Sequence, residues 1–330
     1  MKINYFFRKF NHNQISIEKL FDTIIYYIEK SEVTTKKIIN PFSFSLRGVI
    51  KSFLFFKKNR GQINHITGDI HWASLALNSK NTILTIHDLV GMREYKGAKK
   101  WFYFLFWVFL PIKKAKYITA ISDKTRDEIV KLMPSAASKI TVIPNLLPIE
   151  YIRENFTKQN KILNVLIVGT RNNKNVERIF EAFAEKKIEL TIIGALNSFQ
   201  LKQLEENGLF YNNFINISEE ELLNYYDKAD VLCFPSLYEG FGLPVLEAQA
   251  RNCAVITSNI SPLKEIAGNG AILVNPYNVQ EIREALEILE NEKIRLNLII
   301  KGKDNLKNYL PEIIAQKYMI LYHQILNEKS

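Results

Sequence analysis

The chain has 330 residues, of which 47% are hydrophobic and 24% charged, and its formal net charge at pH 7 is +10. This length predicts two domains rather than one core, and the composition is that of a globular protein without repeats or low-complexity tracts. A basic surface suits nucleic acid, an anionic membrane or phosphorylated substrates. No nucleic-acid-binding motif accompanies it, which favours the last two.

The first half alternates short β-branched runs with helical stretches, a pattern typical of α/β proteins with parallel sheets. The strands predicted here cover residues 2–7, 36–39, 63–67, 82–87, 117–121 and 140–143. A helix is predicted over residues 16–30, because Ser16 and Glu18 are typical of a helix start. The turn-rich residues 144–148 and the charged residues 149–161 then predict a linker.

A second strand–helix series fills the other half, with strands predicted at 165–169, 189–193, 214–217, 230–234, 254–257 and 271–274. The helices predicted between them include residues 219–228, 243–251 and 279–290. Two consecutive βαβ sets predict an α/β fold of two Rossmann-like domains that face a central cleft. Cys233 and Cys253 both lie in apolar runs, which indicates a reducing cytosol rather than a disulfide framework.

Two segments combine aromatic and basic residues. Residues 101–110 are apolar and flanked by lysines, but they are too short to span a bilayer, which needs about 20 residues. Residues 47–60 have a similar character. Two interpretations stay open and are compatible: helices packed on the first sheet, or an interfacial surface that touches anionic lipid. The chain begins with a strand-like run without a signal-peptide pattern, which predicts a cytoplasmic protein, with peripheral binding to the inner membrane face as the further option.

The segment from Pro235 to Ala248 carries the clearest chemistry. A buried strand ends at Phe234, a glycine-rich turn follows, and Pro244 opens a helix. The N–H groups at such a helix start attract anions. Glu239 and Glu247 flank this start, and both are suited to accept hydrogen bonds from the hydroxyls of a ribose and a sugar.

This segment resembles the E-x7-E signature of the retaining nucleotide-sugar glycosyltransferases of family 4, the group 1 enzymes with the GT-B fold. The resemblance covers nearly the whole chain and is strongest from about residue 80 onward. It implies an acceptor-binding domain over residues 1–150 and a donor-binding domain over residues 151–311. The final helix, residues 312–330, is then expected to pack back on the first domain.

The resemblance also implies site residues. Arg171 and Lys174 match the cationic pair that stabilises the leaving diphosphate, Glu247 matches the ribose-binding acid, and Glu239 matches the residue that holds a hydroxyl of the transferred sugar. The donor-binding residues that it implies are Gly169, Thr170, Arg171, Lys174, Pro235, Ser236, Glu239, Gly240, Phe241, Gly242, Leu243 and Glu247. Those expected to act in catalysis are His87, Arg171, Lys174 and Glu239.

In the first domain, His87 matches a family position beside the anomeric carbon, and Asp88 and Asn13 are expected on the acceptor side. One departure concerns residues 8–16, which contain no glycine. Many family members carry a glycine-rich loop there that approaches the donor phosphate. An acceptor-side role is the alternative for this loop.

The expected function is retaining, metal-independent transfer of a hexosyl group from a nucleotide diphosphate sugar, without a cofactor. The acceptor is expected to be a glycan or a lipid-linked saccharide in the biosynthesis of a surface polysaccharide such as lipopolysaccharide. Residues 257–276 resemble mannosyltransferases, which favours GDP-mannose over a UDP-sugar. Alternatives are a non-catalytic GT-B partner subunit and a GT-B sugar-nucleotide epimerase. A nicotinamide-dependent oxidoreductase lacks support, because no G-x-G-x-x-G follows the first strand of either half.

Overall fold

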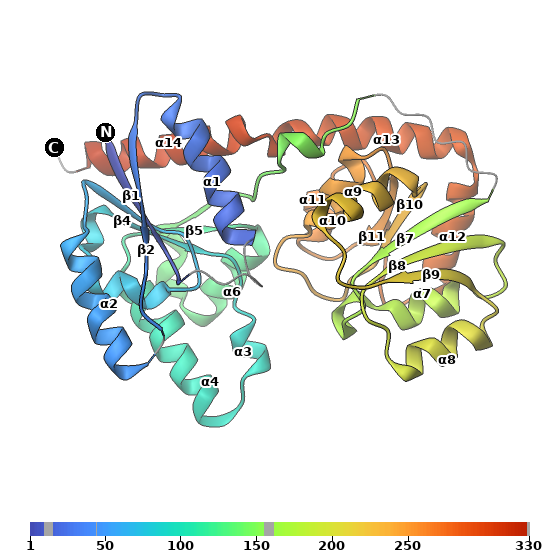
Figure 1. Ribbon diagram of the computed structural model, residues 1–330, viewed down its shortest axis with the longest axis horizontal. Helices are drawn as coiled ribbons and strands as arrows, with labels where there is room; N and C mark the ends of the chain where they lie inside the picture. Colours follow the sequence, from blue (N-terminus) through green and yellow to red (C-terminus); the bar gives the residue numbers. More distant parts are fainter. Residues whose placement is uncertain (10–15, 44, 155–161, 329–330) are drawn as a thin grey trace. The chain divides into compact units, whose positions relative to one another are not determined.

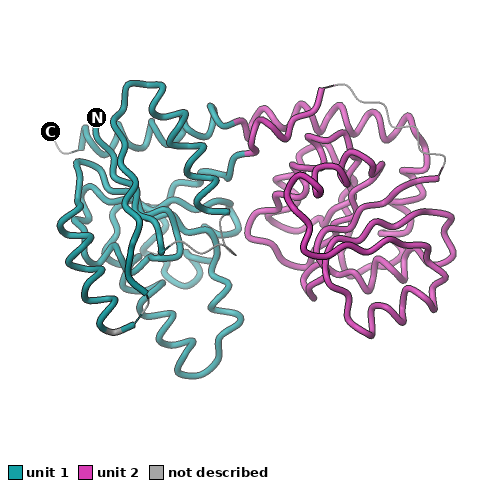
Figure 2. Tube along the Cα trace, viewed as in Figure 1, with its two compact units in different colours: residues 1–146, 311–330 teal, residues 147–310 magenta. Residues whose placement is uncertain are grey.

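The computed structural model describes residues 1–9, 16–43, 45–154 and 162–328. The chain forms two compact units (Figure 2). Unit 1 comprises residues 1–146 and 311–330, and unit 2 comprises residues 147–310. The domain boundaries expected from the sequence, after residues 150 and 311, lie close to these.

Unit 1 is built on a sheet flanked by helices (Figure 1). The sheet is parallel and has six strands in the order β2-β1-β3-β4-β5-β6. Its strands are β1 (Lys2–Phe7), β2 (Thr34–Ile39), β3 (Ile63–Ile66), β4 (Thr82–Ile86), β5 (Tyr117–Ala120) and β6 (Ile140–Val142). Its helices include α1 (Ser16–Glu29), α2 (Leu46–Lys58), the 3-10 helix η1 (His71–Ala76), α3 (Gly91–Glu94), α4 (Gly97–Tyr103), the π-helix η3 (Phe104–Phe109), α5 (Leu110–Lys114) and α6 (Asp123–Leu132). Because all the strands are parallel, the loops that leave their carboxyl ends gather at one edge of the sheet.

The C-terminal helix α14 (Pro311–Asn327) belongs to unit 1. Its apolar face joins a buried cluster with strand β1 and helix α1. A buried polar network also ties it to the sheet: Tyr322 Oη lies 2.7 Å from His65 Nδ1, and Thr85 Oγ1 lies 2.7 Å from His65 Nε2. Burial lowers the pKa of His65 to about 3, so the ring is neutral. Each of its two nitrogens has a hydroxyl partner.

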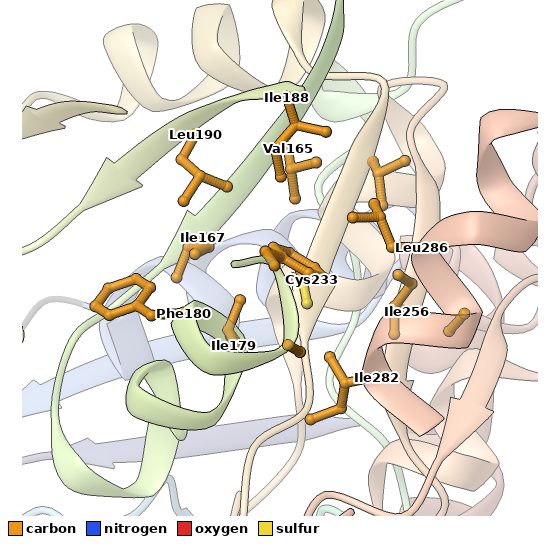
Figure 3. Packing of buried hydrophobic residues seen from close by; sticks show 14 of the residues in the cluster. Val165, Ile167, Ile179, Phe180, Ile188, Leu190, Cys233, Ile256, Ile282 and Leu286 are labelled. Carbon is orange, nitrogen blue, oxygen red and sulfur yellow. The ribbon is translucent and has the colours of Figure 1, made fainter. Parts of the chain in front are cut away.

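Unit 2 contains a second six-stranded parallel sheet, with the order β12-β11-β10-β7-β8-β9. Its strands are β7 (Leu163–Val168), β8 (Ile188–Ile193), β9 (Phe210–Phe214), β10 (Val231–Phe234), β11 (Ala254–Ser258) and β12 (Ile272–Val274). The helices include α7 (Val176–Ala182), α8 (Ser198–Glu206), α9 (Glu219–Lys228), α10 (Leu243–Ala250), α11 (Leu263–Ala267), α12 (Val279–Glu290) and α13 (Glu292–Leu306). Figure 3 shows the core, in which side chains of the central strands meet those of α7 and α12.

The predicted α/β architecture with two parallel sheets is confirmed. One strand was wrongly placed: the expected strand at 214–217 lies earlier, as β9 (Phe210–Phe214). β9 is an edge strand whose sequence contains Asn212 and Asn213, so it has no continuous apolar run. Asn213 Nδ2 instead donates to the carbonyl groups of Ile192 and Gly194, at 3.0 Å and 2.8 Å.

Across the part of the chain that the structure describes, no helix is both long enough and apolar enough to cross a membrane.

Candidate functional site

Two neighbouring strands of unit 2, β7 and β8, end beside a cavity of 460 Å³. The cavity is lined by Gly169, Thr170, Arg171, Lys174, Gly194, Ala195, Asn197 and Gln200. The first four are predicted donor-binding residues, and they follow directly on β7. The carboxyl ends of parallel strands are where open α/β sheets bind ligands, so the cavity has the expected position for a binding site.

The other four lining residues follow β8 and were not predicted from the sequence. Gly194 has a φ of +137°, and a Cβ there would lie 2.8 Å from Thr170 Oγ1, so glycine is required for the two loops to approach. The Gln200 side chain is 1% exposed, and its Nε2 donates to the Thr170 carbonyl at 3.1 Å. A glycine directly after a strand was the sequence signal available for this loop.

Lys174 connects the loop after β7 to residues 235–248, which are called the glutamate segment below. Its Nζ lies 2.7 Å from Glu239 Oε1, and the side chains are 18% and 15% exposed. The same Nζ lies 4.4 Å from the centre of the Phe234 ring. Asn173 Nδ2 donates to the Tyr238 carbonyl at 3.0 Å, which fixes the two loops together. An ammonium group has three N–H donors, so Lys174 can hold Glu239 and also reach a phosphate oxygen.

Hydrogen bonds from Asn175 and Ser258 hold the start of the glutamate segment in place. Asn175 adopts a left-handed conformation with a φ of 62°, and its Nδ2 donates to the Pro235 carbonyl at 3.1 Å. Ser258 Oγ donates to the Ser236 carbonyl at 2.6 Å. Pro235 and Ser236 are buried, so the structure places them in the support of the loop.

The turn into α10 depends on Gly242, whose φ is +114°. A side chain at this φ would be strained, and its Cβ would lie 2.5 Å from Leu263 Cδ2, so the leucine would have to shift. Gly242 provides no side-chain cap for the helix, and Leu243 and Pro244 form its first turn. Phe241 is 4% exposed and packs edge-on against Tyr309, so the turn is anchored in the core of unit 2, whereas Gly240 is half-buried.

Glu247 lies one turn into α10 and accepts a hydrogen bond from Tyr226 Oη at 2.8 Å. Burial raises the pKa of Glu247 to about 7, although the Tyr226 hydrogen bond and the positive charge of Lys174 oppose the increase. The structure therefore brings Lys174, Glu239 and Glu247 into one electrostatic neighbourhood. Arg171 is exposed at the wall of the cavity. Tyr226 was not predicted, because a tyrosine within a helix gives no local sign of a distant partner.

Unit 1 has a cavity of its own, with a volume of 1150 Å³. His87 and Asp88, which follow β4, both line it. His87 Nε2 donates to the Thr67 carbonyl at 2.7 Å, so Nδ1 carries the lone pair of a neutral ring. Burial lowers the pKa of His87, which keeps the ring neutral. Asp88 Oδ1 accepts the backbone N–H of Val90 at 2.9 Å.

The glycine-free loop lies largely outside the described residues, and so does the predicted acceptor-side residue Asn13. Of its described part, Arg8 lines the unit 1 cavity and forms ion pairs with Glu18 and Asp69. Within the described residues, no group of three or more His, Cys, Asp or Glu side chains is arranged to hold a metal ion.

Two sequence profiles match this chain. Residues 149–308 match the profile described as glycosyl transferases group 1, and residues 32–151 match that described as glycosyltransferase family 4. Their common boundary lies close to the start of unit 2.

Several curated proteins that are similar to this chain are named glycosyltransferases or mannosyltransferases. The chain is 26% identical to the O-antigen chain mannosyltransferase RfbU of Salmonella typhimurium, over 72% of this chain and 70% of that protein. It is 25% identical to a serotype-specific mannosyltransferase WbdA of Escherichia coli, over 62% of this chain but only 29% of the relative. A capsular polysaccharide biosynthesis glycosyltransferase of Staphylococcus aureus, CapM, is 23% identical over 94% of this chain and 88% of its own length.

Solved structures share the fold. Sucrose-phosphate synthase from Thermosynechococcus elongatus superposes with a TM-score of 0.75 at 15% identity, covering 99% of this chain and all of that one. The lipopolysaccharide outer core galactosyltransferase WaaB in its apo form superposes with a TM-score of 0.72 at 17% identity, and both chains are covered completely.

Proposed function

The chain belongs to the group 1 glycosyltransferases of family 4 and has the GT-B fold, and from this premise we propose that it transfers a hexosyl group from a nucleotide diphosphate sugar to a saccharide acceptor. Unit 2 holds the donor and unit 1 holds the acceptor. The acceptor is a glycan or a lipid-linked saccharide of a surface polysaccharide such as lipopolysaccharide. GDP-mannose is the favoured donor, because several of the similar relatives are named mannosyltransferases.

One observation carries this proposal: Lys174 lies at the wall of the cavity beside β7 and is held there by Glu239. A fixed cation is suited to stabilise the negative charge that builds on a departing nucleoside diphosphate. Arg171 adds a second cation, whose guanidinium can bind phosphate oxygens in a bidentate manner. With these two cations, the proposed reaction needs no metal ion and no cofactor.

The carboxylates bind hydroxyl groups in this scheme. Glu247 accepts hydrogen bonds from the ribose, and Glu239 holds a hydroxyl of the transferred sugar beside the backbone of Gly240, Phe241 and Gly242. Neither glutamate serves as a nucleophile.

We infer a retaining reaction by attack on the front face of the sugar. The acceptor oxygen forms its bond to the anomeric carbon while the bond from that carbon to the diphosphate oxygen breaks. The departing phosphate oxygen takes the acceptor proton. Attack and departure on one face preserve the anomeric configuration, and His87 orients the acceptor by accepting a hydrogen bond from one of its hydroxyls.

A peripheral position on the inner membrane face is part of the proposal. On α4, Trp101 is 64% exposed and Phe102 is 43% exposed, and Lys99 and Lys100 beside them are exposed too. On α2, Leu54 is 64% exposed. Exposed aromatic residues next to lysines suit the boundary between the headgroups and the acyl chains of an anionic bilayer.

The test incubates the protein with GDP-mannose, UDP-glucose, UDP-galactose and ADP-glucose, each with and without a panel of glycosides, and follows nucleotide release and products by mass spectrometry. Transfer from one donor, with the same anomeric configuration in donor and product by NMR, supports the proposal. Release of free sugar without transfer supports the epimerase-type alternative. Binding of no nucleotide sugar at all would contradict the assignment of unit 2.

A further inference from the structure

The loop after β3 brings a second histidine to the unit 1 cavity. His71 opens η1, is 3% exposed and lines the same cavity as His87. β3 and β4 are neighbours in the parallel sheet, so the loops that carry His71 and His87 leave the same edge side by side. The sequence shows the pairing as Asp69-Ile70-His71 after one strand and His87-Asp88 after the next.

Hydrogen bonds fix the tautomer of His71. Its Nδ1 lies 2.8 Å from the Trp107 carbonyl, and a carbonyl only accepts, so Nδ1 carries the hydrogen. The indole N–H of Trp107 donates back to the Asp69 carbonyl at 2.8 Å, so the loop and η3 are tied in both directions. Burial lowers the pKa of His71 and keeps the ring neutral.

Each of the two rings then offers one lone-pair nitrogen, Nε2 on His71 and Nδ1 on His87. Among the described residues, no hydrogen bond uses His71 Nε2. Such a nitrogen can pair with a hydrogen-bond donor of a ligand. A hydroxyl provides one, whereas an ionised phosphate oxygen is only an acceptor.

The rest of the cavity fits a sugar. Aromatic side chains, among them Trp72, Tyr103 and Trp107, give it apolar walls on which the C–H face of a pyranose can pack. Its volume of 1150 Å³ exceeds the range of about 300–1,000 Å³ that is usual for small-ligand sites, so it has room for more than one ring.

We propose that His71 is a second acceptor-binding residue: its Nε2 accepts a hydrogen bond from one hydroxyl of the acceptor sugar, while Nδ1 of His87 accepts another. This inference rests on the proposed function, because it names the chemistry of the acceptor in the same reaction.

The tryptophans provide a readout that is separate from donor turnover. The chain has three, Trp72, Trp101 and Trp107, and only Trp101 does not line the cavity. In a Trp101→Phe background, fluorescence therefore reports on the cavity. Titration with the methyl glycosides of mannose, galactose, glucose and N-acetylglucosamine is expected to give a saturable change with at least one of them. Inorganic phosphate is expected to give none.

His71→Asn is the decisive variant, because the asparagine amide can still donate to the Trp107 carbonyl but has no acceptor at the position of Nε2. Its affinity for the effective glycoside is expected to fall about tenfold, the effect of one lost hydrogen bond that leaves a hydroxyl unpartnered. His71→Gln places an amide oxygen near the position of Nε2 and is expected to recover part of the affinity. In the transfer assay, His71→Asn is expected to raise the KM for the acceptor about tenfold and to leave the KM for the donor unchanged.

Three results would overturn the inference. They are an unchanged fluorescence with every glycoside up to its solubility limit, a change with phosphate instead, and equal glycoside affinity in His71→Asn and its parent. Matching circular dichroism spectra and unfolding midpoints exclude misfolding as the reason for a loss. Failure of the proposed function looks different: glycosides then bind, but no donor is consumed.

Discussion

Lys174 and Glu239 form an ion pair of 2.7 Å between two loops that leave neighbouring parallel strands of unit 2. Each charge limits where the other lies, and the Phe234 ring beneath Lys174 removes further freedom. The cation is thus held in place before any donor arrives. A preorganised charge stabilises a transition state without the cost of moving into position.

The ion pair predicts strong coupling between its two members. Lys174→Met keeps a long apolar side chain but removes the charge, and kcat/KM for the donor is expected to fall about 100-fold or more. Glu239→Gln keeps the shape and is expected to cause a smaller loss. In a double-mutant cycle, the combined variant should lose much less than the product of the two single losses. Independent, multiplying effects would show that the pair does not act as a unit.

The same pair predicts a modest effect on stability. Both side chains are mostly buried, so Lys174→Met leaves a partly buried carboxylate without its cation and is expected to cost about 1–3 kcal/mol of unfolding free energy. Urea unfolding measures this cost. The control is Lys202→Met, in which the lysine is 70% exposed and pairs with Glu206 on the surface, and its cost is expected to be negligible.

The raised pKa of Glu247 predicts that the stability of the fold depends on pH. Its pKa is about 7 in the folded chain against an ordinary 4.5, so the folded state binds the proton more tightly than the unfolded state. Stability is therefore expected to fall as the pH rises from about 4.5 to about 7 and to change no further through this group above that range. Glu247→Gln removes this contribution, so its stability relative to the wild type should be higher at pH 8 than at pH 5.

Donor binding should follow the opposite trend. Only the ionised carboxylate accepts from both ribose hydroxyls, so the affinity for a nucleotide sugar is expected to rise through about pH 7. Tyr226→Phe removes the hydrogen bond that lowers the pKa of Glu247, and it is expected to shift this transition to higher pH. Calorimetric titration with the nucleotide sugar across this pH range measures the affinity of the wild type and of Tyr226→Phe. A flat profile in the wild type would contradict a ribose-binding carboxylate at this position.

Gly242 is expected to tolerate no side chain. Gly242→Ala combines a φ of +114° with a Cβ 2.5 Å from Leu263, and a cost of about 2–4 kcal/mol in unfolding free energy is expected. Gly208 is a matched control: its φ is +62°, but no atom lies within 4 Å of the position that a Cβ would take, so Gly208→Ala should cost only about 1 kcal/mol. Equal costs for the two variants would show that Leu263 adapts and that the turn is not constrained as described.

The exposed face of α4 predicts binding to anionic vesicles. The protein is expected to sediment with vesicles that contain phosphatidylglycerol and less with neutral vesicles, and salt should weaken the binding. Lys99→Glu with Lys100→Glu should abolish it. Lys293→Glu with Lys301→Glu makes the same change in charge on exposed positions of unit 2 and should have little effect. Equal binding by both double variants would mean that only net charge matters.

Much of the fold follows from the sequence, because buried parallel strands such as β1, β7 and β10 are short apolar runs bounded by polar turns. The position of β9 was not predicted correctly, since this edge strand is stabilised by backbone pairing and by the Asn213 side chain rather than by burial. The strand–turn–helix around Glu239 and Glu247 was predictable too, because glycine and proline mark its turn.

The supporting residues of the sites could not be predicted in this way. Gln200, Tyr226 and His71 have hydrogen-bond partners far away in the sequence: Thr170, Glu247 and Trp107. Such pairs exist only once the sheets have formed, and no local periodicity encodes them. Motif residues carry the recognisable chemistry, and tertiary structure selects the groups that hold them.

The proposed function depends above all on unit 2 binding a nucleotide sugar through Lys174 and Glu247. Calorimetric titration with GDP-mannose and UDP-glucose tests this binding in the wild type, Lys174→Met, Glu247→Gln and the control Lys202→Met. The wild type and the control are expected to bind one donor with equal affinity, and the two site variants about tenfold or more weakly. Equal affinity in all four proteins would contradict the proposal.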